Sequence, residues 1–320
     1  MENKRKALVV CAGILWCCQQ GPFSRAAAIA GKPDTEDDSR LVQIEMKNVN
    51  FRLARDIVME VRKLRGQLKP NKPGVPVTFD DSDSFVVVVD SAEVAITPES
   101  LSALMNSYVL AYRGAPIRDV SVSFEGGRLI QKGTLHKGVG LPFEIEGSIS
   151  TTGDGNVRVH AEKIKLAHVP VKGLLHLFGK DLANVVNQNA GRGMRLDGDD
   201  IILTTRTLTP PPHMVGRVTR VALAGGKIIE YFDSGRHDAA LSPPFQAGAY
   251  IYHRGGVLRF GKLTMADADL EIVGDRPGIF DFFQKEYLKQ LTAGYSKTTA
   301  ANGLVAHMVD YSHVSGGGKK

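Results

Sequence analysis

Residues 120–129 read VSVSFEGGRL, and this stretch contains the pattern that recurs along the chain. Apolar residues alternate with serine from Val120 to Phe124, which is typical of a strand with one buried face. Gly126-Gly127 predicts a tight turn, because the primed hairpin turns need residues that accept positive φ. Residues 129–135 then predict the returning strand. The stretch therefore predicts an antiparallel hairpin.

The same strand–Gly-Gly–strand unit recurs at residues 221–229, VALAGGKII, and at residues 250–260, YIYHRGGVLRF, and both predict further hairpins. The run FVVVV at 85–89 predicts a central strand, because a strand buried on both faces is continuously apolar. Residues 56–68 favour a strand over a helix, since they contain branched side chains and Gly66. Further strands are predicted from shorter alternating stretches at 42–46, 143–149, 157–161, 164–166, 201–203 and 263–272.

Three amphipathic helices are predicted between these strands. The first covers residues 100–112, with Thr97 as its N-cap and Pro98 at its first position. The second runs over residues 171–189 and the third over residues 278–291. Each carries apolar side chains at spacings of three and four, so each is expected to bury one face.

The N-terminal 30 residues have the pattern of an export signal. Three basic residues, Lys4 to Lys6, precede the apolar run Ala7–Cys18, and Ala28-Ile29-Ala30 predicts cleavage before Gly31. The alternatives are an uncleaved N-terminal membrane anchor and, on weaker grounds, a lipoprotein signal. All three cysteines lie before Gly31, so the cleaved chain would contain neither disulfides nor thiolate nucleophiles. We therefore expect a periplasmic or otherwise extracytoplasmic protein.

Composition limits the classes of protein to which the chain can belong. The chain has 320 residues, of which 43% are hydrophobic and 23% charged, as in a folded globular protein. Its net charge of +6 is mild and would fall to +3 on cleavage, so nucleic acid is not an expected partner. Pro210-Pro211-Pro212 is the clearest internal boundary. The predicted organisation is a signal peptide at 1–30, a disordered leader at 31–40, an α+β domain at 41–209, a hairpin-rich continuation with a C-terminal helix at 213–314, and a flexible tail at 315–320.

The sequence contains no recognisable catalytic motif. Its nine histidines are scattered, and no zinc-protease motif, nucleophile elbow or phosphate-binding loop occurs. Residues 80–84, DDSDS, resemble the start of a calcium loop but lack its central glycine and closing glutamate, which favours a solvated turn. We therefore expect a non-enzymatic protein with neither metal nor cofactor. The alternative, if the protein is an enzyme, is a hydrolase whose catalytic residues come together only in the folded chain.

Alternating strands combined with apolar helices predict an α+β fold in which a highly curved antiparallel sheet wraps around amphipathic helices. Incomplete packing inside such a sheet would leave an apolar groove for a phospholipid or similar amphiphile. The groove is predicted to be lined by Leu104, Tyr108, Leu174, Leu175, Phe178 and Leu182. Its headgroup contacts are predicted to be Lys172, Arg192 and Arg195, unless these cations form a solvated helix rim. The alternative is a structural or adaptor protein whose helices fill the core.

The order of the segments strengthens the lipid hypothesis. An amphipathic strand from Leu41 is followed by the first helix, a meander, the phrase VPVKGLL at 169–175, the second helix and the phrase DGDDIIL at 197–203. The phrases IRDVSV at 117–122 and GRVTRV at 216–221 each come before a Gly-Gly turn. Over residues 41–232 this layout resembles the bacterial TULIP-like (tubular lipid-binding) proteins of the cell envelope. The resemblance implies a curved sheet that holds acyl chains against a long helix, and contact with a membrane surface. The chain departs from that family's pattern from Tyr250 onward.

Overall fold

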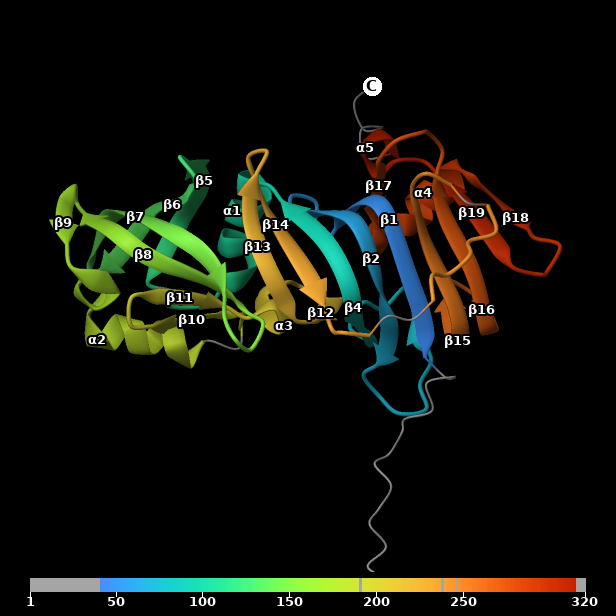
Figure 1. The fold of residues 1–320 in the computed structure, drawn as a ribbon, viewed down its shortest axis with the longest axis horizontal. Helices are drawn as coiled ribbons and strands as arrows, with labels where there is room; N and C mark the ends of the chain where they lie inside the picture. The colour runs from blue at the N-terminus through green and yellow to red at the C-terminus, as the bar shows by residue number, and fades with distance from the viewer. Residues whose placement is uncertain (1–40, 190–191, 237–238, 246, 315–320) are drawn as a thin grey trace, which may run out of the picture. The chain divides into compact units, whose positions relative to one another are not determined.

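The computed structural model describes residues 41–189, 192–236, 239–245 and 247–314 (Figure 1). The predicted signal peptide, leader and tail lie outside these residues. Strands make up 54% of the structure and helices 17%, arranged as large open antiparallel sheets. The predicted β-rich α+β class is confirmed at this level. Among the described residues, no helix has the length and hydropathy that a membrane crossing requires.

The larger sheet, sheet A, contains strands from both ends of the chain in the order β13-β14-β4-β2-β1-β15-β16-β19-β18, with β3, β12 and β17 attached at its sides. The run FVVVV begins β4, which lies between β14 and β2, so the predicted central strand is confirmed. Residues 58–70 form β2, as the strand interpretation of this region predicted. The strands are β1 (Val42–Arg52), β2 (Val58–Pro70), β3 (Val77–Thr78), β4 (Phe85–Ile96), β12 (His213–Val215), β13 (Val218–Ala224), β14 (Lys227–Asp233), β15 (Tyr250–Phe260), β16 (Leu263–Gly274), β17 (Phe280–Phe283), β18 (Tyr295–Thr298) and β19 (Leu304–Met308).

The smaller sheet, sheet B, is built from the middle of the chain in the order β10-β11-β8-β7-β6-β5, with β9 attached to β8. Residues on both sides of 210–212 contribute strands to sheet A, so that boundary does not separate the two sheets. The strands are β5 (Ile117–Glu125), β6 (Arg128–Lys137), β7 (Val139–Thr151), β8 (Val157–Leu166), β9 (Val169–Val171), β10 (Met194–Asp197) and β11 (Asp200–Leu203).

Two of the three predicted Gly-Gly hairpins are confirmed. Gly126-Gly127 joins β5 to β6, and Gly225-Gly226 joins β13 to β14, with positive φ at all four residues. The third prediction is wrong, because Gly255-Gly256 lies inside the continuous strand β15. Its pairing with β16 continues on either side of the glycines, and the chain reverses after Phe260 instead. The two glycines have positive φ but lie inside a strand. The chain does not reverse there because β15 pairs with β16 on both sides of the glycines.

The helices are shorter than predicted, and the third was misplaced. Thr97 caps α1 (Pro98–Leu104) by accepting a hydrogen bond from the Ser100 N–H at 3.2 Å, and a π-helical turn continues the helix to Val109. The predicted helix over 278–291 is wrong in its first half, because Phe280–Phe283 forms β17 beside β1 and buries its aromatic rings there. The remaining helices are α2 (Gly173–Gln188), which has a non-helical residue at Gly179, α3 (Thr205–Leu208), α4 (Tyr287–Ala293) and α5 (Tyr311–Val314).

Both edges of sheet B are closed by asparagine side chains from the helical segments. The Asn106 amide accepts from the Val120 N–H at 2.8 Å and donates to the Val120 carbonyl at 2.6 Å, on the edge strand β5. Asn187 does the same to Leu196 on the other edge strand, β10, at 2.7 and 3.1 Å. Each amide imitates the backbone of a further strand, so these edges present fewer unpaired groups to another chain.

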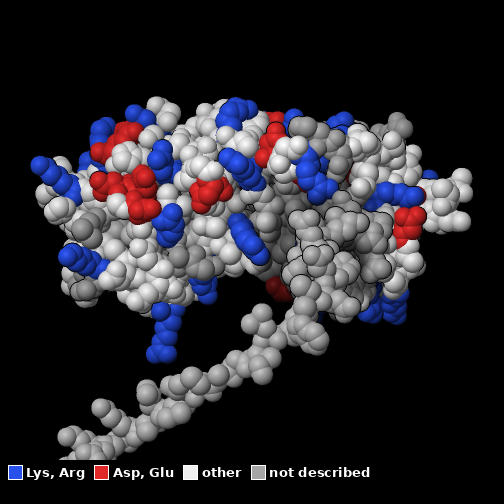
Figure 2. All heavy atoms as spheres, turned by 60° about the horizontal axis from the view of Figure 1, so that its bottom comes forward, with Lys and Arg blue, Asp and Glu red and all other residues white. Residues whose placement is uncertain are grey.

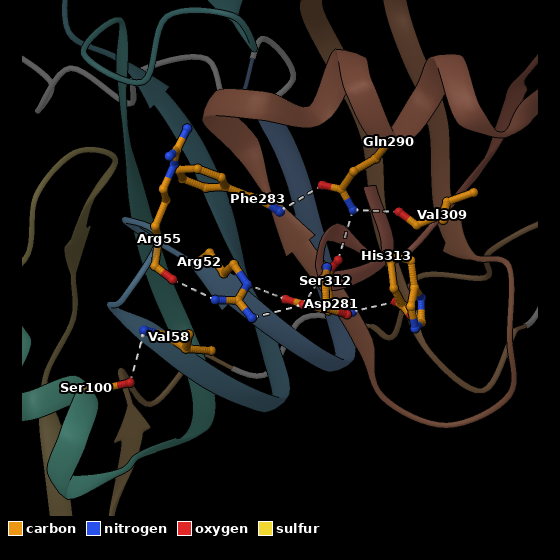
Figure 3. A network of polar contacts seen from close by, with 11 residues as sticks. Arg52, Arg55, Val58, Ser100, Asp281, Phe283, Gln290, Val309, Ser312 and His313 are labelled. Carbon is orange, nitrogen blue, oxygen red and sulfur yellow. Dashed lines mark hydrogen bonds and ion pairs between the residues drawn. The ribbon is translucent and has the colours of Figure 1, made fainter. Parts of the chain in front are cut away.

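A polar network fastens the C-terminal elements to β1 (Figure 3). The guanidinium of Arg52 donates to both carboxylate oxygens of Asp281 at 2.6 and 3.0 Å. The buried Gln290 accepts from the Phe283 N–H and donates to the carbonyls of Asp281 and Val309, each at 2.9 Å. These bonds satisfy backbone groups that α4 and β17 would otherwise leave unpaired in the interior.

Candidate functional site

The predicted apolar lining lies inside the main hydrophobic core. Leu104 and Leu174 are 1% exposed and Phe178 is 2% exposed, while Tyr108 packs half-buried against the same core. The side chains of Leu175 and Leu182 lie outside the described part of the structure. None of the hollows considered below is lined by these residues. Their role in holding a lipid therefore stays a prediction.

The three predicted headgroup cations do not form one cluster. Lys172 is exposed at the N-terminal end of α2, whereas Arg192 follows its C-terminal end. Arg192 donates to the Tyr108 carbonyl at 2.8 Å, and its guanidinium lies 5.9 Å from the Tyr112 ring centre. Arg195 pairs with Asp197 at 2.9 Å on β10. Arg192 and Arg195 thus have partners within the protein, whereas Lys172 is exposed and forms no ion pair with the described residues.

The interior of sheet A contains two adjoining small cavities of about 20 Å³ each. Both are lined by Met46, Phe51, Val87 and Pro212, and one extends to the buried His253. Burial lowers the pKa of His253 to about 4. A volume of this size suits one water molecule rather than an acyl chain.

A much larger hollow, with a volume of about 650 Å³, lies on the opposite, outer face of sheet A. Four of its lining residues, Lys47, Lys63, Tyr231 and Tyr250, belong to a row of side chains that the strand register places side by side, and Glu93 lies in the same row. Lys47 of β1 pairs with Lys63 of β2, and Lys63 pairs in turn with Glu93 of β4. Tyr250 and Tyr231 close the row at its two ends, opposite Lys47 and Glu93 respectively. We call this hollow the outer groove.

Three hydrogen bonds hold the carboxylate of Glu45, which lines the outer groove. Glu45 accepts from Arg65 at 3.1 Å, from the Tyr250 hydroxyl at 2.6 Å and from the Leu241 N–H at 3.2 Å. Burial and this carboxylate raise the pKa of Tyr250, so its hydroxyl stays a donor. Leu241 belongs to residues 239–245, which cross the face of sheet A between β14 and β15 (Figure 1). This segment is thus anchored to Glu45, which lines the outer groove.

The two lysines are the feature of the outer groove that the fold does not require. Lys47 and Lys63 lie directly opposite each other on neighbouring strands, an arrangement in which like charges repel. Glu93 compensates little, because it binds Arg62 at 2.7 Å and lies 3.9 Å from the Lys63 ammonium. Lys47 forms no ion pair with the described residues. The groove therefore offers an anion two exposed lysines from opposite positions on neighbouring strands, of which only Lys63 has a carboxylate partner among the described residues, at 3.9 Å.

The calcium candidate is a turn, as the sequence favoured. Asp80 accepts from the Tyr287 hydroxyl at 2.8 Å and from the Gly261 N–H at 2.9 Å, and Asp81 accepts from the Asp83 N–H at 3.0 Å. Within the described residues, no group of three or more histidine, cysteine, aspartate or glutamate side chains is placed to hold a metal ion. These carboxylates are used to join the turn to its neighbours.

Glu230 provides a test of the electrostatics inside sheet A. It lies on β14 between Ile228 and Phe232, which share its face and are buried, and it forms no hydrogen bond with the described residues. Burial raises its pKa from 4.5 to about 7. The folded chain thus holds this proton more tightly than the unfolded chain, so the contribution to stability is complete below about pH 4.5 and is lost as the pH rises through 7.

We expect Glu230→Gln to raise the free energy of unfolding by about 1–3 kcal/mol at pH 8 and to have little effect at pH 4.5, since the amide carries no charge to bury. Urea unfolding of both proteins across this pH range measures the difference. Glu125→Gln is the control, because Glu125 is exposed at the end of β5. Equal pH profiles for the wild type and Glu230→Gln would contradict the expected burial of the charge.

No model of a known protein family matches the chain, and no curated protein or solved structure is significantly similar to it. The site must therefore be argued from its own geometry. Sequence patterns did not indicate the outer groove, because its lining residues come from five strands separated by up to about 200 residues. The one local signal was the alternation of polar or charged residues, among them Glu45, Lys47 and Arg65, with apolar residues in β1 and β2.

Proposed function

We propose that this protein is a non-enzymatic binding protein that takes up a phosphate-bearing ligand in the outer groove. The observation that supports the proposal is the cross-strand pair Lys47–Lys63, which costs the empty protein stability and would be relieved by a bound anion. A volume of about 650 Å³ is in the range of small-molecule sites. Arg65, held by Glu45, adds a planar donor group beside the lysines.

The ligand class that we favour is the headgroup of an anionic phospholipid. The phosphate is suggested by the lysines, and the amphiphile by the predicted export of the chain and its resemblance to envelope lipid-binding proteins. In this proposal the headgroup lies on the rigid sheet, and the acyl chains extend from the open groove. The protein would work in the cell envelope, where such lipids are available.

The double variant Lys47→Ala/Lys63→Ala is expected to bind dihexanoyl phosphatidylglycerol, used below its micelle concentration, roughly tenfold more weakly than the wild type. Titration calorimetry at two salt concentrations measures the loss and its electrostatic origin. The matched control is Lys72→Ala/Lys262→Ala, which removes the same charge from two exposed turns. Without ligand, the groove variant is expected to be as stable as the wild type or more so.

The probes separate the parts of this proposal. Glycerol 3-phosphate carries the phosphate without acyl chains, and dihexanoyl phosphatidylcholine carries a neutral headgroup. Binding of glycerol 3-phosphate as tight as that of the lipid would overturn the amphiphile but keep the anion site. Equal losses in the groove variant and the turn control would overturn the site itself.

A second candidate, an envelope adaptor with a filled core, is favoured by the near-complete burial of Leu104, Leu174 and Phe178. It differs from the first in requiring no small ligand. A wild-type protein that binds none of the three probes would favour the adaptor.

A further inference from the structure

One end of sheet B carries the two most exposed large apolar side chains of the described structure. Val139 at the start of β7 is 66% exposed, and Val169 at the start of β9 is 62% exposed. The strand order β9-β8-β7 places both segments at this end of the sheet (Figure 1). A hydrogen bond of 2.8 Å from the Ala167 N–H to the Pro142 carbonyl joins them. We call residues 136–142 and 166–172 the sheet B tip.

The composition of the sheet B tip is apolar and basic. The two segments read HKGVGLP and LAHVPVK, with four basic or titratable residues and no aspartate or glutamate. The residues Pro142, Ala167 and Pro170 are exposed together with the two valines. An exposed apolar surface formed by segments that contain lysine and no aspartate or glutamate is suited to the interface of a bilayer with anionic headgroups.

The acidic residues nearest the tip on β7 are already neutralised. Glu144 is bound by Lys165 at 2.9 Å and by Lys132 at 3.4 Å, and Glu146 by Lys163 at 2.9 Å. Figure 2 shows the resulting mixture of basic and acidic side chains over the part of the surface formed by sheet B, at the left of the view. The face of the sheet is therefore an ordinary solvated surface. At its end, the exposed Asp199 lies close to Lys172, because its carboxylate accepts from the Leu174 N–H at 2.9 Å, and the two lysines of the tip segments outnumber this one acid.

We propose that the sheet B tip docks on the surface of an anionic membrane, with Val139 and Val169 inserted between headgroups and Lys172 paired with their phosphates. Lys172 is exposed, and it belongs to the tip because it follows β9 directly. This assigns to Lys172 a headgroup contact outside the protein, at a bilayer, rather than at an internal lipid groove. The docking surface is separate from the outer groove, which is built on other strands.

The docking is tested by flotation with vesicles of phosphatidylcholine containing 30% phosphatidylglycerol, or none. Val139→Asp/Val169→Asp is expected to lower the affinity for the anionic vesicles at least tenfold, and Lys172→Ala about fivefold, since one basic residue near such a surface contributes about 1 kcal/mol. The matched control is Val75→Asp/Val257→Asp, which adds the same charges at valines that are 44% and 41% exposed. Equal flotation of the tip and control variants would overturn the proposal.

A second measurement reports insertion directly, whatever the N-terminal segment contributes to flotation. Val169→Trp is expected to be quenched by brominated lipids in anionic vesicles, in excess of wild type, whereas Val75→Trp is not. Absence of that excess quenching on vesicle-bound protein would also overturn the proposal. The proposals for the outer groove and for the sheet B tip can be tested independently. Lys47→Ala/Lys63→Ala is expected to keep docking to vesicles and to lose binding of the monomeric lipid, and the tip variants are expected to show the reverse.

Discussion

Replacing Phe178 with alanine is expected to lower the free energy of unfolding by about 3–5 kcal/mol, because the ring is 2% exposed and packs in the main core. The cost combines the lost burial of the ring with the cavity left between α2 and sheet B. The neighbouring core residues Leu174 and Leu177 belong to the same helix, so they have little freedom to fill that space. Urea unfolding followed by circular dichroism measures the change.

The same variant distinguishes the two hypotheses for the α2 face. His176→Ala on the exposed side of α2 is the control and is expected to change stability by less than about 0.5 kcal/mol. A loss below about 1 kcal/mol for Phe178→Ala would contradict tight packing. It would instead favour the acyl-chain groove that the sequence predicted, since a ring that faces a ligand-sized space contributes less to the empty protein.

Replacing Gln290 with leucine is expected to cost about 3–5 kcal/mol. The substitution conserves most of the side-chain volume but leaves the Phe283 N–H and the carbonyls of Asp281 and Val309 without their partner (Figure 3). Each unpaired buried group costs about 1–3 kcal/mol. The loss concerns the attachment of α4 and β17 to the end of the chain, so hydrogen exchange is expected to increase there first.

Two further substitutions serve as the control for this prediction and as a test of the hydrogen-bond directions at Gln290. Gln188→Leu, at the exposed C-terminal end of α2, is expected to be nearly neutral. Gln290→Glu keeps the acceptor for Phe283 but turns an oxygen toward two carbonyls, and it is expected to be at least as destabilising as leucine at neutral pH. A mild effect of both Gln290 substitutions would show that water or a local rearrangement satisfies the three backbone groups.

Local backbone chemistry accounts for what was predicted well. The alternation in VSVSF and the glycines at 126–127 specify a strand and a turn from neighbours a few residues apart, as does the Thr97 cap of α1. Predictions from local sequence were wrong where pairing with a distant strand overrode the local preference. Gly255-Gly256 was predicted to reverse the chain, but pairing with β16 keeps β15 continuous. Phe280–Phe283 had helical spacing, but pairing with β1 buries these rings in a strand.

The sequence by itself determined the β-rich class, the hairpins of sheet B and the approximate positions of α1 and α2, because these depend on periodicity and on residues that fix local φ and ψ. Only the tertiary structure decided which charges meet. Lys47, Lys63, Glu93, Tyr231 and Tyr250 become one row because the register of four strand pairs aligns them. Likewise, the sheet order brings Val139 and Val169 to one end of sheet B. Register and strand order arise from burial summed over whole sheets, a quantity that no single stretch of sequence contains.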